Sequence, residues 1–348
     1  QSWYPSAEYE TNNTIKNVGL FDLTPFSKFE IKSDKAHQEL QKICTANIKK
    51  EPGRCIYTHM LNPDGGIETD LTVICIDENH FRIVSSAATR ERDKFHIKKH
   101  LSKNIEVEDI TDDLCVFGLF GPKSRELIKT ISKDNFENDN FKFGTAKYIT
   151  IEGINIWAQR LSYVGELGYE LYVDFKDAKK IYELIINKGK NFNLSNCGMH
   201  AMDIMRMESG FLHWGHDISP EENQYQAGLS FTISKKKDVE FIGKQSLEKI
   251  KQEKIKTKFA MFTLKDSEPG KPLLLHDEPI YLGDKIIGRT TSGNYSFNFK
   301  KNLAFGYIEK DILDGGIKGN DFYIEVEKTK YSADLLTKPL KKTDYKII

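Results

Sequence analysis

Residues 57–73 contain the pattern that most constrains the fold, which is two short apolar runs joined by a turn. The turn segment NPDGG at residues 62–66 combines a proline of fixed φ with glycines that permit positive φ. Beyond the turn, one face of a strand is formed by alternating residues, namely Ile67, Thr69, Leu71, Val73 and Cys75. The pattern therefore predicts an antiparallel hairpin with one buried face.

Asp70 and Thr72 fall on the opposite face of the second strand. Two interpretations exist for Asp70. It is either an exposed strand carboxylate, or a buried carboxylate that needs a partner or a chemical role, because burial of an unpaired charge is unfavourable. From the spacing alone, the exposed strand carboxylate is favoured.

Composition indicates a soluble enzyme. The chain has 348 residues, enough for two or three domains with a substantial core. Lys and Arg together number 51, as do Asp and Glu, so there is no electrostatic basis for binding nucleic acid or an anionic membrane. No apolar run approaches the length of a membrane span, and no charged-then-apolar signal segment opens the chain.

The five cysteines are scattered along the chain without a CxxC pair. This distribution indicates reduced thiols, most of them in the core, and neither a disulfide framework nor a zinc site. We therefore expect a cytoplasmic protein.

The chain changes character near residue 255. Before it, helical periodicity alternates with strand patterns, and helices are predicted at residues 33–48, 87–101, 174–189 and 198–209. After it, helical signals vanish, and short strands alternate with glycine-containing turns. This organisation predicts an α+β fold with two interleaved domains in residues 1–254 and a small β-barrel in residues 255–348.

Two further motifs stand beside the hairpin. Residues 160–170 read RLSYVGELGYE, which alone predicts a strand, a glycine turn and another strand with solvated acids. Residues 201–231 read AMDIMRMESGFLHWGHDISPEENQYQAGLSF, a helix that ends at a glycine and is followed by the segment HWGHD.

These motifs together resemble the glycine cleavage T-protein (aminomethyltransferase) superfamily. YTHMLNPDGGIETDLTV resembles its active-site hairpin, and RLSYVGELGYE resembles its pattern of arginine, tyrosine, Gly-Glu and Gly-aromatic-Glu. HWGHD, GLFDLTPFSKFEI and GRCIYTHMLN resemble the folate-binding C-terminal half of sarcosine and dimethylglycine dehydrogenases. The resemblance implies a three-domain cloverleaf around a central folate channel and covers nearly the whole chain, from about residue 18 to about residue 308 and beyond.

The resemblance also implies roles for single residues, with tetrahydrofolate as the cofactor. Asp70 matches the acid–base carboxylate, and Tyr57, thirteen residues earlier, would position that carboxylate or stack near the aminobenzoyl ring. Glu166 matches the carboxylate that holds the pterin, since a carboxylate accepts a ring N–H and an exocyclic amine as a bidentate pair. Tyr163 would line the same pocket. Glu170 is expected to be structural and to pair with Arg160.

The 201–231 segment adds two expected folate-binding residues, Arg206 and Trp214. Arg206 lies three residues after Asp203, so an ion pair within the helix is favoured for it, and a contact to the anionic folate tail is the alternative. His213 and His216 have no third ligand at suitable spacing, and we expect no metal there.

The implied activity is the trapping of an iminium or formaldehyde unit from an N-methylglycine, sarcosine or dimethylglycine, as 5,10-methylenetetrahydrofolate. Asp70 would accept the proton that N10 loses. No GxGxxG follows a strand, so a flavin oxidoreductase domain or subunit is the expected partner that supplies the iminium.

Two alternatives remain. One is a tetrahydrofolate-dependent demethylase of a sulfonium or quaternary amine, such as dimethylsulfoniopropionate, and HWGHD weighs against it. The other is a non-enzymatic folate-binding protein, and the presence of Asp70 weighs against that.

Overall fold

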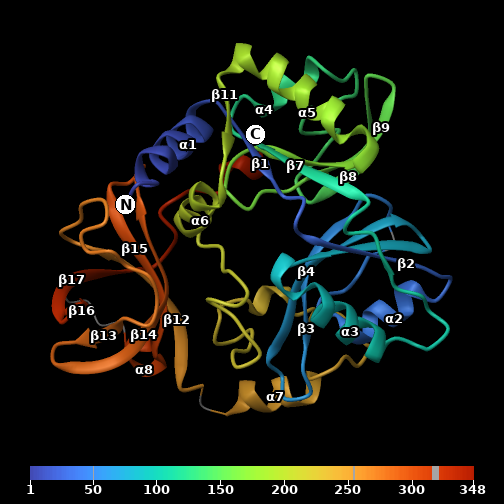
Figure 1. Ribbon diagram of the computed structural model, residues 1–348. Helices are drawn as coiled ribbons and strands as arrows, with labels where there is room; N and C mark the ends of the chain where they lie inside the picture. The colour runs from blue at the N-terminus through green and yellow to red at the C-terminus, as the bar shows by residue number, and fades with distance from the viewer. Residues whose placement is uncertain (50, 254, 316–320) are drawn as a thin grey trace.

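Three sheets, one of them closed into a barrel, organise the residues that the computed structural model describes, which are 1–49, 51–253, 255–315 and 321–348. Figure 1 shows them as three lobes around a central region that contains helix α6 (Met199–Glu208). The α+β prediction is therefore confirmed. In this part of the chain, no helix is both long and apolar enough to cross a membrane.

The first lobe is a sheet of six described strands in the order β11-β1-β7-β10-β9-β8. These strands are β1 (Val18–Asp22), β7 (Leu114–Phe120), β8 (Thr145–Ile151), β9 (Ile154–Arg160), β10 (Gly168–Asp174) and β11 (Leu194–Cys197). Helices α4 (Ser124–Lys129) and α5 (Phe175–Gly189) lie together on one side of the sheet and share its core (Figure 1). The opposite side of the sheet faces the middle of the molecule.

The second lobe is a sheet of five described strands in the order β3-β4-β5-β2-β6. Its strands are β2 (Ser27–Lys32), β3 (Cys55–Leu61), β4 (Ile67–Asp77), β5 (His80–Ser85) and β6 (Glu108–Asp109), and its helices are α2 (Ala36–Ile43), the short 3-10 turn Ala87–Thr89 and α3 (Arg90–His100). The predicted hairpin is confirmed, with His59 opposite Asp70. Leu71, Val73 and Cys75 are buried against α2 and α3, as the alternation predicted.

The chain interleaves these two lobes. Strand β1 belongs to the first sheet, the next segment builds the second sheet, and β7 returns beside β1. The chain therefore leaves the first lobe, builds the second one and returns to the first.

The third lobe is the predicted C-terminal barrel, which is closed. Its strands are β12 (Thr257–Leu264), β13 (Pro279–Leu282), β14 (Lys285–Ser296), β15 (Lys301–Glu309), β16 (Phe322–Val326) and β17 (Thr329–Leu336), with α8 (Lys310–Asp314) beside β15 and α7 (Lys244–Gln252) leading into it. Closure leaves none of these strands as a free edge. The chain then leaves the barrel, and Lys341 N donates to the carbonyl of Glu208 at 2.9 Å. The domain boundary after residue 254 stays a prediction.

The sequence analysis predicted neither the N-terminal helix α1 nor the short helix α8 beside the barrel. Helix α1 (Tyr4–Lys16) packs beside β11 and α6, and its buried residues include Thr11, Asn13 and Thr14. Because its buried face is largely polar, an apolar repeat does not reveal it. The predicted helix at 33–48 is also shorter, since Cys44 is already extended.

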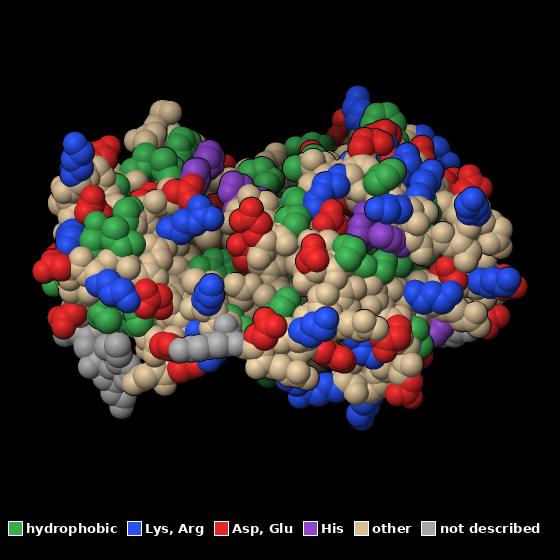
Figure 2. Space-filling view, turned by 90° about the horizontal axis from the view of Figure 1, so that it is seen from below, with side chains coloured by type: hydrophobic (Ala, Val, Ile, Leu, Met, Phe, Trp, Pro, Cys, Tyr) green, Lys and Arg blue, Asp and Glu red, His purple; other side chains and the backbone are tan. Residues whose placement is uncertain are grey.

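Figure 2 shows one outer face of the molecule, on which acidic and basic side chains are interspersed. This pattern agrees with the equal totals of 51 basic and 51 acidic residues. That face therefore presents no extended field of one sign that would attract a polyanion.

Candidate functional site

A cavity of about 970 Å³ lies where the three lobes meet. This volume is at the upper end of the range for small-molecule sites, roughly 300–1,000 Å³. Each lobe contributes polar residues to its wall, among them Tyr57, Asp70, Gln159, Glu170, Arg206 and Ser292. The interleaved sheets thus bring together side chains that lie far apart in the sequence.

Asp70 projects into this cavity from β4. Burial raises the pKa of its carboxyl from 3.8 to about 7, a hydrogen bond from the Tyr57 hydroxyl opposes that rise, and the charge of Asp93 adds to it. Asp93 lies behind the strand and accepts hydrogen bonds from the hydroxyls of Ser85 and Thr89, each at 2.8 Å. A carboxyl that titrates near neutral pH is suited to proton transfer.

Tyr57 links Asp70 to a buried histidine. Its hydroxyl lies 3.3 Å from His59 Nε2, and His59 Nδ1 lies 3.0 Å from the hydroxyl of Thr232. Burial lowers the pKa of His59 to about 3, so the ring is neutral. Tyr57 keeps 38 % of its surface accessible because it faces the open cavity. The structure thus brings Tyr57 and Asp70 together, as the sequence analysis expected.

The two glutamates of the GELGYE segment differ in position. Glu170 lies on β10, lines the cavity and accepts a hydrogen bond from the Tyr172 hydroxyl at 3.1 Å. Glu166 is not among the cavity-lining residues and forms an ion pair with Lys341. The structure therefore places Glu170, and not the expected Glu166, at the wall of this cavity, and the ligand-binding role of either glutamate stays a prediction.

The expected pairing of Glu170 with Arg160 is wrong. Arg160 is buried and donates to the carbonyl oxygens of Phe141 and Ile348, at 2.6 and 2.5 Å. Glu170 retains the Tyr172 hydroxyl as its partner, and burial raises the pKa of its carboxyl to about 7. A carboxylate with spare acceptor capacity therefore faces the cavity.

Arg206 lines the cavity, but its guanidinium is engaged by the protein. It donates to Asp203 at 2.7 Å, which confirms the predicted ion pair, and to Ser292 on β14 at 2.9 Å. It also pairs with Asp217, which is fully buried. These contacts join α6, the HWGHD loop and the barrel, so the structure gives Arg206 a positioning role at the cavity wall.

Tyr163 and Trp214 supply aromatic walls. The Tyr163 hydroxyl donates to the carbonyl of Leu212 at 3.0 Å, and the Trp214 indole N–H donates to the carbonyl of Ile67 at 3.1 Å. The Arg92 guanidinium lies over the Trp214 ring, 4.5 Å from its centroid. Both aromatic residues therefore reach the cavity with their polar atoms already bonded to backbone.

His213 and His216 lie beside each other, with ring centroids 4.6 Å apart. Among the described residues, no group of three or more His, Cys, Asp or Glu side chains is arranged to hold a metal ion. The pair lines the cavity next to Trp214.

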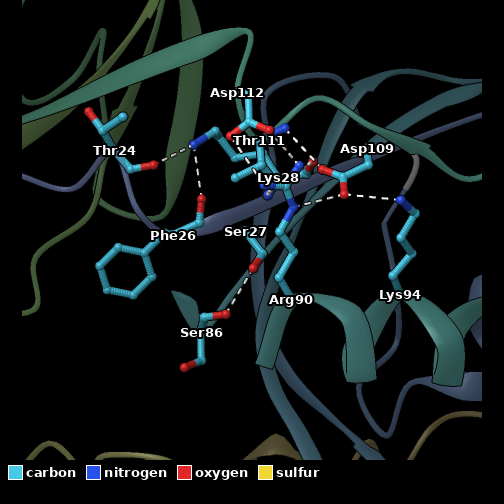
Figure 3. A network of polar contacts seen from close by, with 10 residues as sticks. All are labelled: Thr24, Phe26, Ser27, Lys28, Ser86, Arg90, Lys94, Asp109, Thr111 and Asp112. Carbon is cyan, nitrogen blue, oxygen red and sulfur yellow. Dashed lines mark hydrogen bonds and ion pairs between the residues drawn. The ribbon is translucent and has the colours of Figure 1, made fainter. Parts of the chain in front are cut away.

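Lys28 supports a backbone turn that forms part of the cavity wall. The sequence analysis did not predict this role. Figure 3 shows its ammonium group directed at the carbonyl oxygens of Thr24 and Phe26, both at 2.9 Å. Burial lowers the pKa of Lys28 to about 8. Because Phe26 lines the cavity, these bonds hold the 23–27 turn in position.

The wall chemistry suits a flat heteroaromatic ligand with adjacent N–H donors. Glu170 offers a carboxylate to the cavity, and the side chains of Tyr163, Tyr172 and Trp214 offer aromatic surface. Gln159, beside Glu170, has neither amide atom hydrogen-bonded within the described residues. A pterin presents N–H donors and acceptors of this kind, so the residues present fit a folate.

Comparison with known proteins bears on the fold and the family. The family model described as the GCVT N-terminal domain matches residues 1–237, and the glycine cleavage T-protein C-terminal barrel domain matches residues 258–342. A crystal structure of the aminomethyltransferase T of the glycine cleavage system from Bartonella henselae superposes with a TM-score of 0.84. It covers 96 % of this chain and 89 % of that one at 19 % identity, which shows the fold alone.

Two sequence relatives differ in length. The chain is 32 % identical to the mitochondrial dimethylglycine dehydrogenase of Rattus norvegicus over 99 % of this chain, but spans 40 % of that protein. It is 31 % identical to an aminomethyltransferase of Halothermothrix orenii over 88 % of this chain and 85 % of that protein. With both family models matched along its length, the chain belongs to the glycine cleavage T-protein (aminomethyltransferase) family.

Proposed function

We propose that this chain is a tetrahydrofolate-dependent one-carbon transferase that traps an iminium or formaldehyde unit from an N-methylglycine as 5,10-methylenetetrahydrofolate. One observation carries the proposal. Asp70, with a pKa of about 7, and Glu170 face the same cavity from two different sheets. One site thereby offers a carboxylate that can accept a proton and a second carboxylate that can accept hydrogen bonds from a pterin.

Bound tetrahydrofolate would supply the two nitrogens that take up the one-carbon unit. Glu170 would accept the adjacent N–H donors of the pterin, and Tyr163 and Trp214 would flank the ligand with aromatic surface. Hydrogen-bond donors from the ligand favour the ionised form of Glu170, so binding would lower the pKa of that carboxyl from its raised value.

Asp70 would remove the proton that the reacting nitrogen loses. Its raised pKa gives it useful basicity near neutral pH, and the Tyr57 hydroxyl orients its carboxylate. With a ligand bound, the apolar and aromatic residues of the wall would limit the access of water, which would protect an iminium from hydrolysis.

A flavin oxidoreductase domain or subunit is the proposed partner. The support is the likeness to a dimethylglycine dehydrogenase of which this chain spans only 40 %. In that arrangement, the oxidation of the amine takes place elsewhere and this cavity receives the product.

Product analysis with tetrahydrofolate and different one-carbon donors tests the proposal. With formaldehyde, the chain is expected to form 5,10-methylenetetrahydrofolate faster than the uncatalysed reaction, and it should not oxidise sarcosine by itself. Formation of 5-methyltetrahydrofolate from dimethylsulfoniopropionate without an oxidant would instead identify a demethylase. Tetrahydrofolate binding without either reaction would identify a binding protein, and both outcomes would overturn the proposal.

The two glutamates give a paired prediction for binding. Glu170→Gln is expected to weaken tetrahydrofolate binding by about 10- to 100-fold, because a hydrogen bond to a charged group contributes about 1.5–3 kcal/mol. Glu166→Gln, which alters the largely buried ion pair with Lys341, serves as the matched control and should retain affinity within about threefold, because Glu166 does not line the cavity. Isothermal titration measures both, and a larger loss in the Glu166 variant would reverse the assignment.

A further inference from the structure

Gln159 is a buried side chain whose amide group is not used for hydrogen bonding by any residue that the structure describes. It lies on β9, is fully buried and lines the cavity. Within the described residues, neither its amide oxygen nor its amide nitrogen has a hydrogen-bond partner. Other buried side chains of the described residues also have one polar atom without a partner, but Gln159 has two and lines the cavity, so it needs an explanation.

An unpaired buried amide is unfavourable in the free protein. Leaving a buried donor or acceptor without a partner costs on the order of the desolvation of that group, and Gln159 carries both kinds. The cavity is the side from which a partner can reach it. The arrangement is therefore that of a site whose hydrogen bonds are completed by a ligand.

The pairing of β9 with β10 places Gln159 directly beside Glu170. The two residues are direct partners in the antiparallel pair of β9 and β10, so their side chains project from the same face. Opposite residues in such a pair have Cβ atoms about 4.5–5.5 Å apart. A carboxylate that only accepts and an amide that both donates and accepts thus form one continuous row.

We propose that Gln159 is a specificity-determining residue that recognises the edge of a reduced pterin ring next to the donors held by Glu170. This inference rests on the proposed function. A tetrahydropterin has one further set of polar atoms on each side of its 2-amino and N3–H donors. One set is the acceptor N1 with the donor N8–H, and the other is the acceptor O4 with the donor N5–H. A primary amide matches either set with one donated and one accepted bond.

The same hydrogen-bonding pattern would allow the site to distinguish reduced pterins from oxidised ones. In folic acid, N5 and N8 carry no hydrogen, so the donor of each set becomes an acceptor. The amide oxygen of Gln159 then faces a nitrogen lone pair instead of an N–H. Gln159 therefore favours tetrahydrofolate over folic acid.

Titration of the full chain with both compounds tests this role. Gln159→Leu is expected to weaken tetrahydrofolate binding by about 10- to 100-fold, the loss of one to two hydrogen bonds of a buried site, and folic acid binding by less than about threefold. Gln159→Met, which keeps the side-chain length, should behave in the same way. Asn155→Leu, an exposed amide on the same strand, is the matched control and should change neither affinity.

A thermal unfolding scan of the free proteins adds a readout that does not depend on the ligand. Both apolar variants of Gln159 should unfold at the wild-type temperature or above, because each removes two unpaired buried atoms. Unchanged tetrahydrofolate affinity, or equal losses for both compounds, would overturn the inference while leaving the proposed function intact. A wild-type chain that does not bind tetrahydrofolate would overturn both.

Discussion

Replacement of Asp70 by asparagine is expected to lower the folate-dependent rate by about 10²–10⁴-fold, the usual contribution of a positioned general base. Asparagine keeps the size and shape of the side chain but cannot accept the proton. Affinity for tetrahydrofolate should stay within a few-fold of the wild type, because the pterin is assigned to Glu170. Formation of 5,10-methylenetetrahydrofolate at saturating folate measures the rate, and an undiminished rate would exclude Asp70 as the base.

The pH dependence provides a second readout on Asp70. Because its pKa is raised to about 7, the wild-type rate should fall as the pH drops below about 7, and this dependence should vanish in the asparagine variant. The raised pKa also bears on folding. The stability that Asp70 contributes is present below its unfolded pKa of 3.8 and is lost as the pH rises through about 7. At pH 8, Asp70→Asn should therefore be at least as stable as the wild type, which separates lost chemistry from lost folding.

The second large effect is expected for stability. Asp217→Ala should lower the free energy of unfolding by about 3–5 kcal/mol, the range for breaking a buried ion pair, because it leaves the Arg206 guanidinium buried without its main partner. Asp217 also accepts hydrogen bonds from the Ser292 hydroxyl at 2.8 Å and the His213 N–H at 3.0 Å. Its loss therefore loosens the contact between the HWGHD loop and the barrel.

Urea unfolding measures that change, with an exposed ion pair as the control. Glu183→Ala breaks a surface pair with Lys179 on α5 and should alter the free energy of unfolding by less than about 1 kcal/mol. A loss of similar size in the Asp217 and Glu183 variants would contradict the structural role given to the buried pair.

Local pattern predicted much of the fold. The hairpin at residues 57–73 was foreseen because turn chemistry and strand alternation agree there, and the barrel because helical signals end near residue 255. Helix α1 was missed because its buried face carries threonines and an asparagine, which produce no apolar repeat. The interleaving of the first two sheets depends on long-range pairing that no local pattern encodes.

The candidate site was predictable only in part. Asp70 and Tyr57 are on adjacent strands of one hairpin, so their proximity follows from local structure. Glu166 and Glu170 are four residues apart, and their positions depend on where β10 begins, which is at Gly168. Glu166 therefore stays in the turn, and Glu170 enters the strand and faces the cavity.

Contacts between residues that lie far apart in the chain could not be predicted from the sequence. Arg206 on α6 donates to the Ser292 hydroxyl on the barrel, 86 residues further along the chain. The role proposed for Gln159 depends on the pairing of β9 with β10, which places it opposite Glu170. Each of these contacts requires the tertiary fold.

A crystal structure of the chain with tetrahydrofolate tests the central claim most directly. The account predicts the pterin in the central cavity, with its adjacent N–H donors on the Glu170 carboxylate and its reacting nitrogens next to Asp70. A folate bound outside this cavity, or bound in it with the pterin remote from both carboxylates, would contradict the account.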